Sequence, residues 1–246
     1  MANPATYSPT TEWRTAPTDR IAGFTSAGMI DWPGRVAATV FLSGCAYRCP
    51  YCHNPQLKVA ASDHSQWNAL RVYLRLRKSW IDGVVLTGGE PTDDPGLIVL
   101  LEALAEEPVP VKLDTNGSHP ELLGRLIADK LVSYVAVDFK TTPARYEAVT
   151  GRADAAERLL RTVEIVKTSG VPHEFRTTAY PGAVEMDELP VIAEILSGCD
   201  LYALQQFRNS TTLDPRASRV EPYHPDHLQA ALAACQVHVP TTLRGA

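Results

Sequence analysis

The sequence predicts a single α/β domain whose parallel sheet curls into a complete or partial (β/α)6 barrel of the TIM type. Six short apolar or β-branched runs alternate with longer segments of helical period, and no break in composition divides them. Glycines and charged or amide residues follow these runs repeatedly at one end, as at the mouth of an α/β barrel. A flat doubly wound sheet has the same alternation, and periodicity alone does not exclude it.

The expected strands are nearly continuous in apolar residues or alternate only weakly, which is typical of strands covered on both faces. A further strand is a candidate close to the end of the chain, after the last helix. The six expected strands are Val36–Leu42, Gly83–Gly88, Val109–Thr115, Val132–Phe139, His173–Tyr180 and Asp200–Phe207.

The expected helices lie between these strands, and a further one follows the sixth. Pro95 and Pro120 are expected in first turns, where the missing N–H of proline leaves no hydrogen bond unmade, and Gly170 is a typical helix stop. The polar, proline-rich segment Asn209–Pro225 is an irregular excursion. The helices are Ser65–Ser79, Pro95–Glu106, Pro120–Lys130, Ala153–Ser169, Met186–Leu196 and Asp226–Ala234.

The two ends of the chain and its net charge indicate the compartment and the class of partner that we expect. Residues 1–18 are expected to be a flexible polar tail, and residues 19–246 one domain. The first residues lack the layout of a signal peptide, and no apolar run reaches the roughly 18 residues of a membrane span. These features favour a cytoplasmic protein with reduced thiols. The net charge of -5 gives no basic surface for a nucleic acid.

Three of the five cysteines fall within eight residues in the spacing C-x3-C-x2-C, at Cys45, Cys49 and Cys52. An odd, crowded set is a poor disulfide framework and favours metal or redox chemistry. Three thiolates leave one coordination position open, whereas a fourth ligand would close the site as in structural zinc. In that alternative, a zinc-stabilised binding module, the fourth ligand would be Cys199, Cys235 or His53.

Polar motifs follow each of the other expected strands. Because the carboxyl ends of parallel strands share one mouth, we expect these motifs to form one site with the cysteine loop. They are TGGEP (Thr87–Pro91), DTNG (Asp114–Gly117), DFK (Asp138–Lys140), TAYPG (Thr178–Gly182) and QQFRN (Gln205–Asn209).

CAYRCPYC followed by TGGEP resembles the radical S-adenosylmethionine (radical SAM) superfamily. This resemblance implies the radical SAM fold, with Cys45, Cys49 and Cys52 ligating three irons of a [4Fe–4S] cluster. The fourth iron of such a cluster binds S-adenosylmethionine, whose reductive cleavage gives a 5′-deoxyadenosyl radical. Tyr51 matches the position that meets the adenine, although packing beside the cluster would also explain it.

A narrower resemblance covers most of the chain. The lead-in GMIDWPGRVAATVFLSGC, with CHNP, TGGEP, DTNG and DFK, resembles the glycyl-radical-enzyme activating enzymes, above all those of anaerobic ribonucleoside-triphosphate reductase. It implies a radical SAM oxidoreductase that forms a glycyl radical on that reductase, with flavodoxin or ferredoxin as electron donor. Asp31–Arg35 differs from the GPG lead-in of the pyruvate formate-lyase activators. Activation of pyruvate formate-lyase or of another glycyl-radical enzyme is an alternative function. A small-molecule enzyme similar to 7-carboxy-7-deazaguanine synthase is a further alternative.

The family resemblance also assigns residues to the cofactor. Gly88, Gly89 and Glu90 match the motif that receives the methionyl amino group, since glycine permits close backbone approach and an anionic Glu90 would offset an ammonium. Asp114, Thr115, Asp138 and Lys140 match the positions near the carboxylate and ribose of the cofactor. In pyruvate formate-lyase activators, residues at these positions also hold a monovalent cation.

Three further residues have less definite roles. The pyruvate formate-lyase activators carry a cofactor-contacting histidine after the sixth strand, where this chain has QQFRN, so Gln206 or Arg208 would substitute for it. Arg176 would either point into the barrel or be paired within it.

Overall fold

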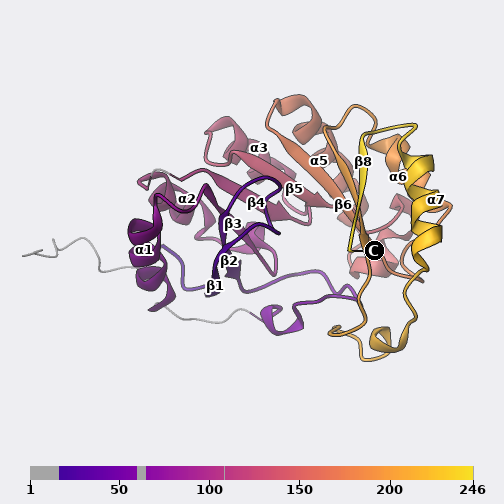
Figure 1. The fold of residues 1–246 in the computed structure, drawn as a ribbon, viewed down its shortest axis with the longest axis horizontal. Helices are drawn as coiled ribbons and strands as arrows, with labels where there is room; N and C mark the ends of the chain where they lie inside the picture. The colour runs from indigo at the N-terminus through magenta and orange to yellow at the C-terminus, as the bar shows by residue number, and fades with distance from the viewer. Residues whose placement is uncertain (1–16, 60–64, 108, 246) are drawn as a thin grey trace, which may run out of the picture.

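The computed structural model describes residues 17–59, 65–107 and 109–245 and contains one curved sheet with helices on its outer side (Figure 1). The eight strands of the sheet follow one another in chain order. The first strand is antiparallel to the second, and every later strand is parallel to its predecessor. The strands are β1 (Ile21–Gly28), β2 (Ala37–Leu42), β3 (Gly83–Gly88), β4 (Val111–Thr115), β5 (Tyr134–Asp138), β6 (His173–Ala179), β7 (Tyr202–Gln206) and β8 (Thr241–Arg244).

Helices connect most of the parallel strands and cover the outer side of the sheet, where α3 packs against α5 and α6 against α7. The α-helices are α1 (Ser65–Arg77), α2 (Leu97–Ala105), α3 (Pro120–Ala128), α4 (Tyr146–Thr150), α5 (Ala155–Ser169), α6 (Glu188–Ile195) and α7 (Pro225–Cys235). The 3-10 helices are η1 (Pro55–Leu57), η2 (Pro91–Asp93), η3 (Pro143–Arg145) and η4 (Ala217–Arg219).

The strand order confirms the partial barrel. It runs from β1 to β8 without the reversal that marks a doubly wound sheet. Among the described residues, β1 and β8 form the two edges of the sheet and do not pair with each other. The six expected strands are β2–β7, and the expected strands and helices end within two residues of the observed ones.

The sequence pattern misses β1 and α4. The residues of β1, IAGFTSAG, are mostly small, and most are partly or fully exposed, so they carry no strand pattern. Helix α4 is only five residues long, too short for a helical period to be visible. Pro95 lies before α2, whose N-cap is Gly96, so the expected helix start is two residues early.

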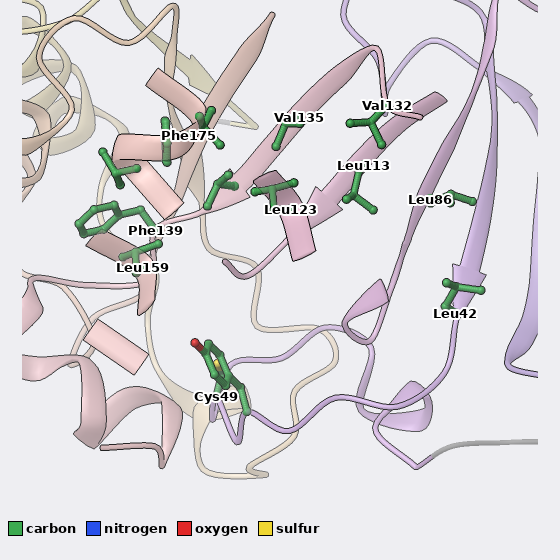
Figure 2. Close-up of a cluster of buried hydrophobic side chains, with 14 of the residues drawn as sticks. Leu42, Cys49, Leu86, Leu113, Leu123, Val132, Val135, Phe139, Leu159 and Phe175 are labelled. Atoms are coloured by element: carbon green, nitrogen blue, oxygen red, sulfur yellow. The ribbon is translucent and has the colours of Figure 1, made fainter. Parts of the chain in front are cut away.

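Apolar strand residues form the core together with the inner faces of the helices. Leu42, Leu86 and Leu113 lie on β2, β3 and β4, whereas Cys49 lies apart from them among the loops beyond the strand ends (Figure 2). The three leucines are fully buried. The strands therefore form a rigid platform on which the loops at the carboxyl ends are held.

The lead-in between β1 and β2 closes the opposite end of the barrel. Trp32 is 3% exposed and packs beside Gly83, where any Cβ would lie 2.6 Å from the indole ring. The Asp31 carboxylate accepts a hydrogen bond from the Thr39 hydroxyl (2.7 Å), and the Asp31 carbonyl accepts one from the Lys112 ammonium. The motif that distinguishes this lead-in therefore has a structural role at the amino ends of the strands.

The expected tail falls almost entirely on residues 1–16, which lie outside the described residues. Thr18, the last residue assigned to the tail, is 6% exposed. Its hydroxyl donates a 2.6 Å hydrogen bond to Asp94, so the chain is packed against the domain from that point. Within the described part of the chain, the helices are too short or too polar to cross a bilayer.

Candidate active site at the carboxyl ends of the strands

A cavity of about 280 Å³ lies at the carboxyl ends of the strands. The cysteine loop and the ends of β3 to β7 all contribute to its wall. Every residue assigned above to the cluster or the cofactor lines this cavity, except Gln206 and its alternative Arg208, which lie in an adjoining hollow. Those lining residues are Cys45, Cys49, Tyr51, Cys52, Gly88, Gly89, Glu90, Asp114, Thr115, Asp138 and Lys140.

Hydrogen bonds to backbone atoms hold the first part of the cysteine loop, from Gly44 to Arg48. Gly44 N–H donates to the Leu57 carbonyl (2.7 Å), and Arg48 N–H donates to the Thr150 carbonyl at the end of α4 (2.8 Å). Ala46 N–H donates to the Asp93 carboxylate (2.8 Å). The Lys58 ammonium donates to the carbonyls of Cys45 (3.0 Å) and Tyr47. The loop is thus fixed by the protein itself, with its three thiols facing one space.

The thiols of this loop are free and partly or wholly buried. Burial, together with the Glu90 carboxyl, raises the pKa of the Cys45 thiol to about 12, against the opposing charges of Lys58 and Lys140. Burial likewise raises the pKa of the Cys49 thiol. A metal centre that displaces these protons would therefore stabilise the thiolate form strongly.

Two glycines let the end of β3 lie very close to the end of β2, its parallel neighbour in the sheet. Gly88 has φ +124°, and a Cβ there would lie 2.3 Å from the Leu42 carbonyl oxygen. At Gly89 a Cβ would lie 2.1 Å from the Gly44 carbonyl oxygen. Hydrogen bonds from Gly89 N–H to Leu42 (2.8 Å) and from Glu90 N–H to Gly44 (2.7 Å) join the two segments. The glycines are required because the GGE segment touches the cysteine loop.

Glu90 is almost fully buried and receives four hydrogen bonds. Its Oε1 accepts from the hydroxyls of Thr92 (2.5 Å) and Thr115 (2.7 Å) and from Thr92 N–H, and its Oε2 accepts from Asn116 N–H (2.6 Å). Burial raises the pKa of this carboxyl in spite of these donors. Oε2, with a single protein donor, keeps capacity to accept an ammonium group from the cavity.

The two aspartates of the cavity are joined by Arg176. Its Nη1 donates to Asp114 Oδ2 (2.9 Å) and its Nε to Asp138 Oδ1 (2.9 Å). Lys140 donates to Asp138 Oδ2 (2.9 Å), and Lys112 lies 3.3 Å from Asp114 Oδ1 without hydrogen-bond geometry. Burial alone would raise the pKa of Asp138, but Arg176 and Lys140 outweigh it and hold that pKa well below its usual value.

Aromatic rings line one side of the cysteine loop. Tyr51 is 3% exposed and stacks on Tyr180, with ring centroids 4.9 Å apart. Tyr180 meets Phe207 edge to face at 4.8 Å, and Phe207 lies beside His53. Tyr51 is therefore packed within a row of aromatic rings, and a ligand in the cavity would contact its ring in that packed position. The packing role and the expected ligand contact are compatible.

The structure corrects the residue expected after the sixth strand. Gln205 lines the cavity, whereas Gln206 lies in an adjoining hollow and donates to the Tyr223 carbonyl (3.1 Å). Successive side chains of a strand point to opposite faces, and Thr178 pairs with Gln205 in the sheet. Because β7 is buried on both faces, its sequence carries no signal that says which glutamine faces inward.

Several residues of the cavity received no definite role from the sequence. Arg176 sits inside β6, and its charge within an expected strand was the available signal. The other residues lie in motifs or loops, where the sequence pattern does not show whether a side chain points into the cavity. The cavity residues that received no definite role are Tyr47, Asn54, Lys58, Thr87, Asn116, Arg176, Thr178 and Gln205.

The cysteines proposed for a closed zinc site are elsewhere. Cys199 and Cys235 are buried and do not line the cavity. His53 lines it, with its Nδ1 3.1 Å from the Thr211 carbonyl. In the described residues, no three His, Cys, Asp or Glu side chains gather closely enough to hold a single metal ion. The three thiols therefore have no additional cysteine beside them.

Residues 39–194 match the family profile of the Radical SAM superfamily. Two solved structures have the same fold. SuiB from Streptococcus suis gives a TM-score of 0.61 at 14% identity, over 82% of this chain and 47% of SuiB. Coproporphyrinogen III oxidase HemN from Escherichia coli gives 0.60 at 14% identity, over 85% of this chain and 54% of HemN. This chain thus spans about half of each protein.

Enzymes of this superfamily use a [4Fe–4S] cluster and S-adenosylmethionine, and the residues of the cavity fit both groups. Three thiols on one fixed loop would supply three sulfur ligands to the cluster and leave its fourth iron for another molecule. The buried Glu90 carboxylate suits an ammonium group. Arg176 and Lys140, which both contact Asp138, supply positive charge to the same cavity.

Curated relatives narrow the family. A protein of Methanocaldococcus jannaschii, described as a glycyl-radical enzyme activating enzyme, is 35% identical over 79% of this chain and 82% of its own length. The pyruvate formate-lyase-activating enzyme of Streptococcus mutans is 29% identical over 66% of each chain. The profile match and the first of these relatives, taken with the cavity, show that the chain belongs to the radical SAM superfamily, in its family of glycyl-radical enzyme activating enzymes.

Proposed function

We propose that this chain activates anaerobic ribonucleoside-triphosphate reductase by forming a glycyl radical in it. The observation that carries the proposal is one cavity that contains three thiols, the GGE segment and an aspartate pair. The choice of the reductase rests on the lead-in Asp31–Arg35. Because that lead-in lies at the far end of the barrel, it supports the choice through family resemblance and makes no contact with a substrate at the mouth.

Each group of residues has a defined task in this proposal. When bound, the cluster and S-adenosylmethionine supply an electron and a carbon-centred oxidant that can remove a hydrogen atom from a glycine α-carbon. The cysteine loop fixes the cluster ligands through its backbone contacts. Glu90 accepts the ammonium group of the cofactor, and the buried strands keep water away from the reacting atoms.

The shape of the mouth suits a polypeptide substrate. Among the described residues, the sheet does not close between β1 and β8. The irregular segment 207–224 lies beside the cysteine loop, since Asp214 N–H donates to the Pro50 carbonyl (2.9 Å) and His53 contacts Thr211. A glycine on an extended loop, with no side chain, would pass between these segments more easily than a bulkier residue.

The test is anaerobic reconstitution with iron and sulfide, followed by reductant, S-adenosylmethionine and a candidate partner. We expect a glycine-centred doublet in electron paramagnetic resonance with anaerobic ribonucleoside-triphosphate reductase. Cys49→Ser should lose both this signal and the release of 5′-deoxyadenosine. Cys199→Ser, a change of a cysteine outside the cavity, should keep both. Flavodoxin and ferredoxin can then replace the chemical reductant, to identify the donor.

Pyruvate formate-lyase is the second candidate partner, because relatives at 29% identity activate that enzyme according to their names. A doublet formed only with pyruvate formate-lyase would replace the reductase in the proposal. Release of 5′-deoxyadenosine with no doublet on either partner would favour a small-molecule substrate.

A further inference from the structure

Two further hollows adjoin the cofactor cavity. The first, here called the β1 hollow, has a volume of about 320 Å³ and shares Asn54 with the cavity. The second, the Arg208 hollow, has a volume of about 230 Å³ and shares His53, Thr178 and Gln205 with the cavity. Since His53 and Asn54 are consecutive residues, the two hollows lie next to the same part of the cavity rim.

The β1 hollow runs along an edge of the sheet. Four consecutive residues of β1, Ala22–Thr25, form one wall, and Phe41 and Leu57 contribute apolar side chains. Among the described residues, no charged side chain lines this hollow, and no strand pairs with the outer side of β1. An extended polypeptide can add to such an edge through main-chain hydrogen bonds, with its side chains in neighbouring pockets. The β1 hollow therefore suits an extended segment with apolar side chains.

The Arg208 hollow has the opposite chemistry, because all of the residues that line it are polar. Arg208 is exposed and forms no ion pair in the part of the chain that the structure describes. Its guanidinium reaches the end of β8, where a Cβ on Gly245 would lie 3.7 Å from Arg208 Nη2. Gln206 fixes the wall by donating to the Tyr223 carbonyl (3.1 Å). This hollow therefore offers an unpaired cation to a carboxylate.

The positions of the hollows match the open side of the barrel. The β1 hollow lies at one edge strand, and the Arg208 hollow lies beside the end of the other, β8. A target glycine has no side chain, so it differs from other glycines only through the residues on either side of it. Two hollows of different chemistry beside the cavity can supply that distinction.

We propose that these hollows bind the substrate polypeptide on opposite sides of its target glycine, the β1 hollow an apolar segment and the Arg208 hollow an acidic one. The inference rests on the proposed function, because it takes the substrate to be a polypeptide, but it does not depend on which glycyl-radical enzyme supplies that polypeptide. It assigns Arg208 to the substrate, whereas the family resemblance would place this residue at the cofactor.

The main test measures peptide binding to the reconstituted holoprotein with S-adenosylmethionine and without reductant, by fluorescence anisotropy. Four labelled heptapeptides carry a central glycine, and each three-residue flank extends about 10 Å from it. Two are mixed, ALVGDSD and DSDGALV, and two are uniform, ALVGALV and DSDGDSD. We expect one mixed peptide to bind roughly fivefold or more tightly than both uniform peptides, since each hollow then receives its own flank. Equal affinities for all four would overturn the proposal.

Variants of the β1 hollow provide the second test. Ala22→Glu introduces a charge into the uncharged hollow at an exposed position, and it should weaken the preferred mixed peptide by roughly fivefold. Ala27→Glu is the matched control, because Ala27 is also exposed on β1 and lies outside the hollow. It should bind like the wild type. Equal weakening by both variants would mean that the hollow does not hold the peptide.

Arg208→Met tests the other hollow and separates the substrate from the cofactor. It should remove the preference for an acidic flank, whereas Arg219→Met, at an exposed arginine outside both hollows, should keep it. Equilibrium dialysis should show the affinity for S-adenosylmethionine changed by less than about twofold in all four variants. If Arg208→Met weakens S-adenosylmethionine and leaves the peptides unaffected, Arg208 belongs to the cofactor and the proposal is wrong.

The same variants can then be compared with the whole reductase as substrate. Ala22→Glu and Arg208→Met should raise its KM and leave kcat within about twofold, because the hollows lie outside the cofactor cavity. A fall in kcat alone would contradict a role in substrate binding. If no glycyl radical forms on the reductase although the peptides bind as expected, that result counts only against the proposed partner.

Discussion

Gly89 illustrates how the residue type of a functional motif can be set by contacts within the protein. The GGE motif suggests a backbone that approaches a ligand closely. In the structure the close approach is to the Gly44 carbonyl at the start of the cysteine loop. The glycines thus couple the end of β3 to the residues that would hold the cluster.

Gly89→Ala should therefore damage the cysteine loop. Its Cβ would lie 2.1 Å from a backbone oxygen, so the loop has to move. We expect a loss of roughly 2 kcal/mol in the free energy of unfolding, within the range of backbone strain and overpacking, and less iron and sulfide after reconstitution. Gly23→Ala on β1, where a Cβ has open space, is the control. Equal iron content in both variants would refute the argument.

The pair His119 and Asp93 predicts a pH dependence of stability. The Asp93 hydrogen bond (2.7 Å) raises the pKa of His119, so this contribution is complete below about 6.5 and is lost as pH rises through the folded value. Burial alone would raise the pKa of Asp93, but His119 and Ala46 N–H lower it, so its contribution is lost only in acid.

Urea denaturation at pH 6 and pH 8 measures this effect. His119 is 37% exposed, so solvent screening limits the contribution to about 0.5 kcal/mol. Wild type should lose that much more stability between the two pH values than His119→Asn, which preserves a residue suited to the N-cap of α3. Identical pH slopes would mean that the pair is not formed in solution.

The places of site residues were predictable where a motif lies at the end of a strand, whereas the roles of these residues stay predictions. The cysteine spacing and GGE brought the cluster and cofactor residues to one cavity. The choice between Gln205 and Gln206, and the pairing of Arg176 with both aspartates, depend on which face of a buried strand each side chain occupies. The sequence of a strand that is largely buried on both faces does not carry this information.

At the scale of elements, β8 is held partly by a buried charge. Arg244 is on β8, and its guanidinium lies 2.6 Å from the Glu174 carboxylate on β6, two strands away. Glu174 is wholly buried. The strand itself has only four residues, so this ion pair supplements a short ladder of hydrogen bonds with β7.

Arg244→Met should destabilise the domain by about 3 kcal/mol, because it leaves the buried Glu174 with Lys112 as its remaining ion-pair partner among the described residues. Chemical denaturation gives this value. Arg216→Met breaks an exposed pair with Asp214 and should have a much smaller effect, because solvent screens that pair. A comparable, small effect of both changes would show that Glu174 does not need Arg244.

The elements show where periodicity is informative. Six strands and six helices were predicted to within two residues because each carries a long apolar run or a helical period. β1 lacks such a run, and α4 is too short to show a period. α4 nevertheless matters to the site, since its last carbonyl, on Thr150, accepts the Arg48 N–H of the cysteine loop.

For the whole molecule, binding of the cluster should stabilise the fold. The cysteine loop is tied to α4, to Asp93 near the end of β3 and to the segment after β7. A group that binds only the folded loop adds its binding free energy to the stability of the domain. Each kcal/mol corresponds to a melting temperature higher by roughly 2–4 °C for a chain of this size.

Anaerobic differential scanning fluorimetry checks this expectation. Reconstitution should raise the melting temperature of the wild type, and removal of iron by a chelator should return it to the starting value. Cys49→Ser should show no rise, whereas Cys199→Ser should show the same rise as the wild type from its own baseline. A rise that persists in Cys49→Ser would indicate iron bound elsewhere.

The closed far end of the barrel has a consequence for the order of events. Trp32 and Asp31 occupy that end, and Lys112 and Glu174 fill the interior above it. The mouth is then the entrance for small molecules and also the landing place for a macromolecule. We expect the nucleoside-bearing cofactor to bind before the polypeptide covers the mouth. The cleavage products of the cofactor should dissociate after the polypeptide has left.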